Sequence, residues 1–164
     1  MLPMQKNNSD IRIDRLRPQT PEIEICARWR IDAFSDVLGN TYAQEEQRLN
    51  DFVSGGPDQV GFVAYVGNLP AGTCLLAPKE IEPCHPLTPW LAGLFVAAEF
   101  RRRGVAEALI RAIENAAKEQ GHDFIYLYAD EKEVPFYAKR GWTVAEQFEW
   151  LGAPTTLMSK VLST

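Results

Sequence analysis

Residues 94–106 read LFVAAEFRRRGVA and join a strand, a loop and a helix in one short segment. The segment starts inside an apolar run from Trp90 to Val96, which predicts a strand buried on both faces. It passes through Arg101, Arg102, Arg103 and Gly104 into a stretch with apolar residues at helical spacing, namely Val105, Leu109, Ile110, Ile113 and Ala117. The segment therefore predicts a buried strand, a basic loop and a long amphipathic helix.

The start of this helix has the chemistry of an anion site. Small residues at Gly104 and Ala106 let a ligand approach the backbone closely. The first N–H groups of a helix lack internal acceptors, and the helix dipole favours negative charge there. Together with the arginines, these features favour a phosphate or pyrophosphate site. The alternative on these residues alone is a solvated basic turn.

Periodicity and turn residues predict the remaining elements outward from this segment. We expect a strand at 11–13, helices at 21–38 and from a capping box at Thr41 to Gly55, a hairpin of strands 60–66 and 71–77, an irregular proline-rich loop within 78–89, a strand at 124–128, a short helix at 135–140, and a closing hairpin of strands 142–150 and 155–162. This order predicts a mixed α/β (α+β) fold with hairpins rather than a doubly wound sheet. We expect a loose leader at 1–10 and one domain at 11–164.

Composition excludes several classes of protein. The chain has 164 residues, of which 46% are hydrophobic and 24% charged, which indicates one globular domain. Its net charge of −5 argues against a nucleic-acid partner. The chain carries no apolar run of membrane-span length and no secretory leader, so we expect a cytoplasmic protein without a membrane partner. Cys26, Cys74 and Cys84 are odd in number and form no C-x-x-C pair, so we expect neither a disulfide framework nor a metal site.

Two motifs make the chain resemble the GNAT superfamily of N-acetyltransferases. The family's acetyl-CoA motif [QR]-x-x-G-x-[GA] is matched by Arg101-x-x-Gly104-x-Ala106. Its second motif, N-x-x-A-x-x-[LF]-Y-x-K-x-G-[FW], is matched by Asp130-x-x-Glu133-x-x-Phe136-Tyr137-x-Lys139-x-Gly141-Trp142. The resemblance covers nearly the whole chain. It implies a GNAT-like acyl-CoA N-acyltransferase fold, with a mixed, mostly antiparallel sheet and about four helices.

Two positions depart from the second motif. Asp130 stands where the family often has Asn, so the side chain keeps its acceptor and capping roles and loses its N–H donors. Glu133 stands where the family has a small residue.

The resemblance also implies what particular residues do. The main chain of the strand should pair with the pantetheine arm of acetyl-CoA, and the loop amides should hold its pyrophosphate. Tyr137 should protonate the departing thiolate as general acid; its alternative role is packing beside Phe136. The implied cofactor-binding residues are Leu94, Phe95, Val96, Arg101, Arg102, Arg103, Gly104, Val105, Ala106, Asp130 and Tyr137.

The implied reaction moves the acetyl group of acetyl-CoA directly to a primary amine, on a small molecule or on a peptide or protein, without a metal. The alternatives are a non-catalytic sensor of CoA or acyl-CoA and an interaction protein with a relic site. Homodimers are common in the family, so we carry a homodimer as an expectation.

The sequence leaves the general base and the acceptor pocket open. The acidic residues of the helical segment that flanks the family's acceptor site are expected on a solvated face: Asp32, Asp36, Glu45 and Glu46. His85 and His122 are expected to be structural or solvent-facing. Trp29, Phe34 and Tyr42 line either an acceptor pocket or the core, and Tyr126 and Tyr128 share one face of a strand without an assigned role.

Overall fold

A computed structural model describes residues 10–80 and 85–162, apart from the side chains of residues 35–38. Almost all of the expected leader, and Cys84, therefore lie outside the described residues. The elements are β1 (Ile11–Arg15), α1 (Pro21–Leu38), α2 (Tyr42–Val53), β2 (Val60–Val66), β3 (Leu69–Ala77), β4 (Trp90–Val96), a 3-10 turn (Ala98–Phe100), α3 (Val105–Glu119), β5 (Phe124–Ala129), α4 (Val134–Ala138), β6 (Thr143–Trp150) and β7 (Ala153–Val161).

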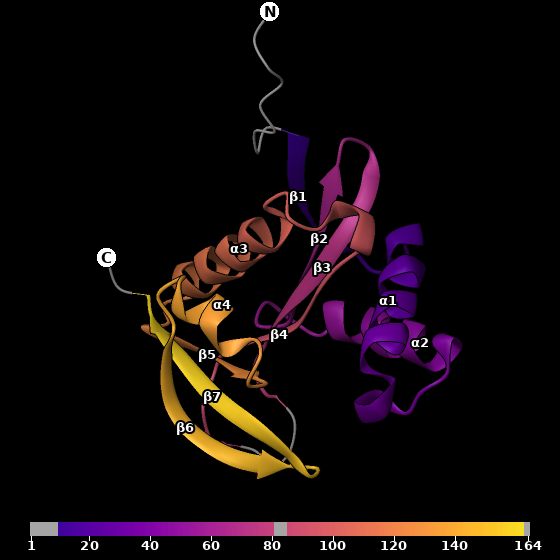
Figure 1. Ribbon diagram of the computed structural model, residues 1–164. Coiled ribbons are helices and arrows are strands. Elements are labelled where there is room, and N and C mark those ends of the chain that lie inside the picture. The colour runs from indigo at the N-terminus through magenta and orange to yellow at the C-terminus, as the bar shows by residue number, and fades with distance from the viewer. Residues whose placement is uncertain (1–9, 81–84, 163–164) are drawn as a thin grey trace, which may run out of the picture.

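The strands form one sheet with helices on both sides (Figure 1). Across the described part of the chain, the strand order is β1-β2-β3-β4-β5-β7-β6. Neighbouring strands are antiparallel except for β4 and β5, which are parallel. The predicted mixed, mostly antiparallel sheet with about four helices is thereby confirmed.

Two clusters of buried side chains join the layers. The apolar residues predicted for α3 are all buried, and they pack against one face of β1 to β4. On the opposite face, α1 and α2 bury Ile23, Cys26 and Leu49 against Val63 and Leu75. The helical periodicity in the sequence therefore identified the face of α3 that meets the sheet.

The parallel strands β4 and β5 diverge. Within the described residues they share a single register pair, Trp90 with Tyr126. Beyond that pair β5 continues to pair with β7, up to Ala129 with Thr156. Beyond this pair a gap therefore separates β4 from β5, and the later part of β4 has an open edge toward this gap.

A bulge changes the direction of β4 beside this gap. Thr73 pairs with Phe95 and Leu75 pairs with Ala92, so β4 has one residue more than β3 between the two pairs. Gly93 lies in this bulge with a φ of +65°, which glycine adopts without strain. A Cβ at Gly93 would also overlap the Nη1 atom of Arg30, so the guanidinium would have to move for any other residue.

Candidate active site

The loop between β4 and α3 is shaped as an anion cradle. Arg102 and Gly104 have φ values of +64° and +90°, both in the left-handed region. The amide of Ala108 donates to the Gly104 carbonyl at 3.0 Å, so the amides of Val105, Ala106 and Glu107 precede the first intrahelical hydrogen bond. Such successive N–H groups form a nest for a phosphate oxygen.

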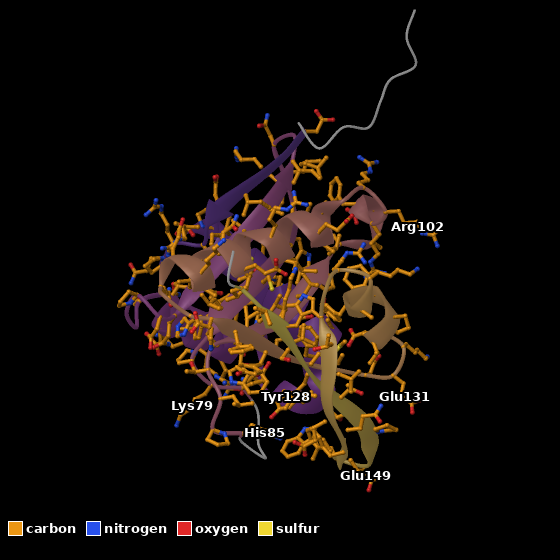
Figure 2. All side chains as sticks on the ribbon, turned by 90° about the vertical axis from the view of Figure 1, so that its left-hand side faces the viewer. Lys79, His85, Arg102, Tyr128, Glu131 and Glu149 are labelled. Atoms are coloured by element: carbon orange, nitrogen blue, oxygen red, sulfur yellow. The ribbon has the colours of Figure 1, made fainter. Side chains whose placement is uncertain are left out.

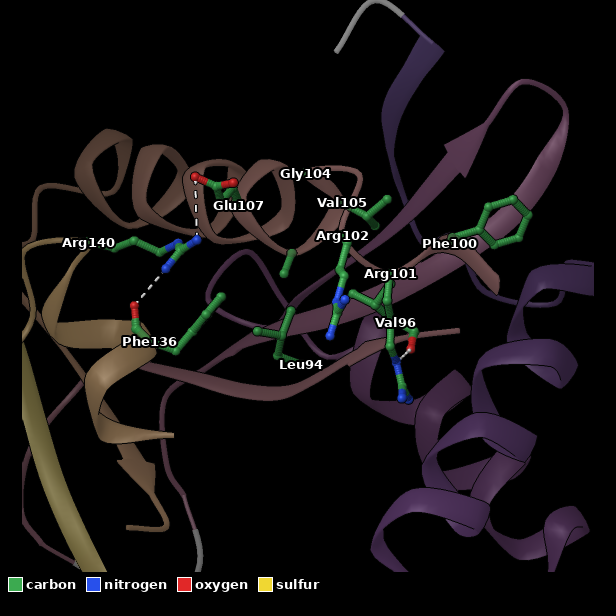
Figure 3. A pocket seen from close by; sticks show the side chains of 11 residues that line it. Leu94, Val96, Phe100, Arg101, Arg102, Gly104, Val105, Glu107, Phe136 and Arg140 are labelled. Carbon is green, nitrogen blue, oxygen red and sulfur yellow. Dashed lines mark hydrogen bonds and ion pairs between the residues drawn. The ribbon is translucent and has the colours of Figure 1, made fainter. Parts of the chain in front are cut away.

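A groove of about 430 Å³ opens beside this loop, and we call it the basic groove. It is lined by Leu94, Val96, Phe100, Arg101, Arg102, Gly104, Val105, Ala106, Glu107, Phe136 and Arg140 (Figure 3). Arg101 is held against the end of β4, because its Nε donates to the Val96 carbonyl at 3.0 Å. Seven of the predicted cofactor-binding residues are thus brought together around one groove.

The other predicted residues lie outside the basic groove. The ring of Phe95 packs against Trp29, with 5.3 Å between the centroids. Arg103 is exposed, and its guanidinium lies 5.7 Å from the ring centroid of Phe100. Tyr137 lines a second cavity, described below.

Asp130 and Glu133, the two departures from the family motif, pair with each other. The Asp130 carboxylate accepts a hydrogen bond from the Glu133 amide at 2.9 Å, and the Glu133 carboxylate accepts one from the Asp130 amide at 3.1 Å. This reciprocal arrangement caps the turn that leads into α4. Asp130 lines neither cavity, so its cofactor contact stays a prediction.

Arg140 is a groove residue that the sequence analysis did not single out. Its guanidinium lies 3.8 Å from the ring centroid of Phe136 and donates to the Phe136 carbonyl at 2.8 Å. An ion pair of 3.6 Å joins it to Glu107 on α3, which fixes the guanidinium over the groove. The only available signal was a cation in the last turn of the predicted helix.

A second cavity of about 210 Å³, which we call the inner pocket, lies on the other side of the β4 edge. It is lined by Arg30, Phe34, Glu80, Leu91, Ala92, Gly93, Leu94, Leu127, Tyr128, Glu133 and Tyr137. Leu94 lines both cavities, so they meet at the bulge of β4. Phe34 is therefore at the pocket, whereas Trp29 packs in the core and Tyr42 is exposed.

Tyr137 lines the inner pocket with a phenol that keeps its proton. The side chain is buried, with its ring edge-on to those of Phe136 and Trp142. Burial is the largest cause that raises the pKa of Tyr137 well above the usual value, and Cys74, Glu133 and Asp130 add to the shift. The phenol therefore stays protonated at any ordinary pH.

The charge of Arg30 at the inner pocket is compensated from α2. Its Nε donates to the Glu45 carboxylate at 2.7 Å, and Asn40 donates to the same carboxylate at 3.0 Å. Glu45 is only 2% exposed, so the expectation that it lies on a solvated face is wrong. The ion pair is the physical reason, because a buried carboxylate needs a charged or hydrogen-bonding partner.

Asp32 and Glu46, two of the other candidate bases, line neither cavity. Asp32 is exposed and accepts a hydrogen bond from the Tyr42 hydroxyl at 2.7 Å. Glu46 lines neither cavity, and the side chain of Asp36 lies outside the described residues.

The described cysteines are inert side chains of the core. Cys26 and Cys74 are free and fully buried. Burial raises the pKa of Cys26 to about 12 and raises the pKa of Cys74 further, so neither thiol ionises near neutral pH.

The described part of the chain contains neither a cluster of metal-ligating side chains nor a membrane-spanning helix. Within residues 10–80 and 85–162, no group of three or more His, Cys, Asp or Glu side chains is arranged to hold a metal ion. No helix in the same ranges is long and apolar enough to cross a bilayer.

Comparison with known proteins identifies relatives of this chain. The model of the acetyltransferase (GNAT) family matches residues 23–142. A Bacillus subtilis (strain 168) protein, whose name assigns it provisionally to the acetyltransferases, is 30% identical over 99 residues. These residues are 60% of this chain and 63% of that protein, so the match spans less than two thirds of the relative.

Solved structures share the fold at low sequence identity. An aminoglycoside 6'-N-acetyltransferase complexed with coenzyme A superposes with a TM-score of 0.75 at 15% identity, covering 93% of this chain and 98% of that one. A GNAT-family acetyltransferase from Streptococcus pneumoniae gives 0.71 at 15% identity, over 93% and 99% of the two chains. Ard1 from Thermoplasma volcanium gives 0.69 at 17% identity, over 94% and 99%.

Proposed function

The chain belongs to the acetyltransferase (GNAT) family, and we propose that it transfers the acetyl group of acetyl-CoA directly to a primary amine. The observation that carries this proposal is the meeting of two cavities at Leu94. Arg101, Arg102 and Arg140 make one cavity basic, whereas Glu80 and Glu133 bring carboxylates to the other. One cavity suits a polyanionic donor and the other suits a cationic acceptor.

The basic groove fits acetyl-CoA. Its pyrophosphate would lie on the free amides at the start of α3, with the arginines as counter-charges. The pantetheine arm would pair with the open edge of β4 in the manner of an added strand. This placement takes the thioester to the bulge beside Leu94, at the entrance to the inner pocket that Tyr137 lines.

The transfer step balances without a covalent enzyme intermediate. The neutral amine nitrogen attacks the thioester carbon, an N–C bond forms and the C–S bond breaks. The phenol of Tyr137 gives its proton to the departing thiolate, and the amine loses one proton to a base. The buried, un-ionised thiols of Cys26 and Cys74 support direct transfer over an acyl-cysteine route.

The inner pocket favours a cationic acceptor. Glu80 and Glu133 attract an ammonium group, while Glu45 neutralises the charge of Arg30. A small-molecule amine and a peptide or protein amine both satisfy this requirement. The fold neighbour complexed with coenzyme A is an aminoglycoside 6'-N-acetyltransferase, which places aminoglycosides among the amines to test.

The test is release of the CoA thiol from acetyl-CoA in the presence of kanamycin, spermidine, L-lysine and a peptide with a free N-terminal alanine. We expect release that depends on at least one amine, with acetylated amine as the product. CoA binding without any amine-dependent release of the thiol would indicate a non-catalytic CoA sensor instead of an enzyme. Absence of CoA binding would contradict both.

A further inference from the structure

A chain of three polar side chains runs from the inner pocket to the molecular surface. The Tyr128 hydroxyl lies 2.5 Å from Nδ1 of His85, and Nε2 of His85 lies 3.0 Å from Oε1 of Glu146. Tyr128 lines the inner pocket, and Figure 2 shows it close to His85. The His85 side chain is 20% exposed and that of Glu146 is 51% exposed, so the chain ends in solvent.

The partners of His85 determine where its proton lies. An ionised carboxylate can only accept a hydrogen bond, so Nε2 of the neutral ring carries the hydrogen and donates it to Glu146. Nδ1 of this tautomer carries no hydrogen and accepts the hydrogen bond from the Tyr128 hydroxyl. The chain has the same logic as a nucleophile–histidine–carboxylate triad, with a tyrosine hydroxyl at the pocket end.

The fold holds the members of this chain in place from several elements. Val144 pairs with Met158 and Glu146 pairs with Leu157, so β6 has a bulge immediately before Glu146. Bulges of this kind redirect side chains next to functional sites. The ring of Phe148 lies 5.5 Å from that of His85 and 5.6 Å from that of Tyr128, which packs both rings from β6.

We propose that Tyr128, His85 and Glu146 form the proton relay that deprotonates the acceptor ammonium. The inference rests on the proposed function and supplies the base that its reaction needs. The ammonium gives a proton to the Tyr128 oxygen, directly or through one water. The Tyr128 hydroxyl proton moves to Nδ1 of His85, and Glu146 stabilises the resulting imidazolium until it returns a proton to solvent.

Other charged groups face this relay. Glu146 is the carboxylate that contacts His85, while Glu80, Glu133 and Arg30 line the same pocket as Tyr128. The carboxylates are the rival bases. Glu133 is exposed and its pKa is raised, burial being the largest cause, so it remains a rival that the test must separate. The relay is a continuous hydrogen-bonded path from the pocket to solvent.

The kinetic test compares variants that keep the packing. Tyr128→Phe and His85→Gln remove a transferable proton site, whereas Tyr126→Phe alters the neighbouring tyrosine on the same strand face and His122→Gln alters a histidine outside the pocket. With each panel amine that the parent chain acetylates, we expect kcat/KM near pH 7 to fall about 10²-fold in the first two variants. The two controls should stay within about threefold.

The pH dependence separates a proton relay from a structural role. Near pH 10 much of a lysine-like amine is already neutral, so the fall in kcat/KM in Tyr128→Phe and His85→Gln should shrink to within about threefold. A deficit of the same size at both pH values would overturn the relay. An intact rate in His85→Gln would also overturn the relay if Glu133→Gln or Glu80→Gln removed the acidic limb of the pH profile of kcat/KM.

A nitrogen NMR experiment tests the relay without catalysis. We expect the neutral His85 ring to carry its hydrogen on Nε2, and its Nδ1 signal to shift in Tyr128→Phe and not in Tyr126→Phe. A hydrogen on Nδ1 would overturn the relay. If no panel amine is acetylated, the proposed function fails, and this measurement still decides whether the hydrogen-bonded chain exists.

Discussion

Gly104 combines a left-handed backbone with a position on the basic groove, so a side chain there has two separate consequences. Its φ of +90° strains any other residue by about 1–2 kcal/mol. A side chain would also occupy the space of the phosphates. We therefore predict that Gly104→Glu abolishes CoA binding, because it adds both bulk and a repelling charge, and calorimetric titration with CoA measures this.

Gly121 supplies a matched control for this prediction. It has the same φ of +90° at the other end of α3, and a Cβ there meets no atom within 4 Å. Gly121→Glu should thus cost similar stability and leave CoA affinity unchanged. Unchanged affinity in Gly104→Glu would place the cofactor elsewhere.

Tyr137 carries the second residue-scale prediction. Phe keeps the ring that packs on Phe136 and Trp142 and removes only the hydroxyl. Tyr137→Phe should lower kcat by roughly 10- to 10³-fold with little change in acetyl-CoA affinity, as expected for a transition-state interaction. Because burial raises the pKa of Tyr137, its phenol should add no basic limb to kcat below about pH 10.

The measurement requires conditions in which chemistry limits turnover, and Tyr126→Phe is the control. An unchanged kcat in Tyr137→Phe would leave Tyr137 with a packing role only.

At the scale of elements, a hydrogen bond to a carboxylate joins α1 to the sheet. The Tyr65 hydroxyl on β2 donates to the Glu22 carboxylate in the first turn of α1 at 2.7 Å. This bond is the largest cause that lowers the pKa of Glu22, and burial raises the pKa of Tyr65 to about 12. Tyr65→Phe should therefore lower the free energy of unfolding by about 1–2 kcal/mol near pH 7.

The sign of the pH dependence follows from the two shifts. The lowered pKa of Glu22 means that its contribution is present above about pH 4.3 and is lost as the pH falls through the folded value. The raised pKa of Tyr65 means that its contribution is present below about pH 10 and is lost toward pH 12. Urea unfolding should show the Tyr65→Phe deficit shrinking from about pH 7 to about pH 3.

Tyr42→Phe is the matched control for this pair. Tyr42 also donates to a carboxylate at 2.7 Å, that of Asp32, but both groups are exposed. Its removal should change the unfolding free energy much less than Tyr65→Phe does, because solvent screens an exposed pair. If the stability lost in Tyr65→Phe did not depend on pH, the hydrogen bond to the ionised Glu22 carboxylate would not be its cause.

At the scale of the whole molecule, we predict that activity needs neither cysteine nor metal. The replacement of Cys26, Cys74 and Cys84 by Ala should leave turnover within about threefold, although the loss of two buried thiols should cost about 1–3 kcal/mol of stability. A chelator should leave turnover unchanged. Lost turnover in a folded triple variant would indicate an acyl-cysteine route instead.

Elements with a strong local pattern were predictable from the sequence. The apolar spacing of α3 identified both the helix and its buried face, and Arg101-x-x-Gly104-x-Ala106 located the start of the helix. The break at Phe34 within α1 was not predicted, because neither proline nor glycine lies near it in the sequence.

The sequence by itself therefore determined the order of elements, the basic loop before α3 and the place of Tyr137 on a short helix after β5, since these depend on neighbours within a few residues. Only the tertiary structure decided the burial of Glu45 against Arg30, the place of Arg140 over the groove, and the meeting of Tyr128, His85 and Glu146. His85 lies 43 residues from Tyr128 and 61 from Glu146 in the chain. Residues so far apart in the chain leave no mark on helical or strand periodicity, because periodicity reflects only near neighbours. The fold brings them together, with the bulge in β6 immediately before Glu146.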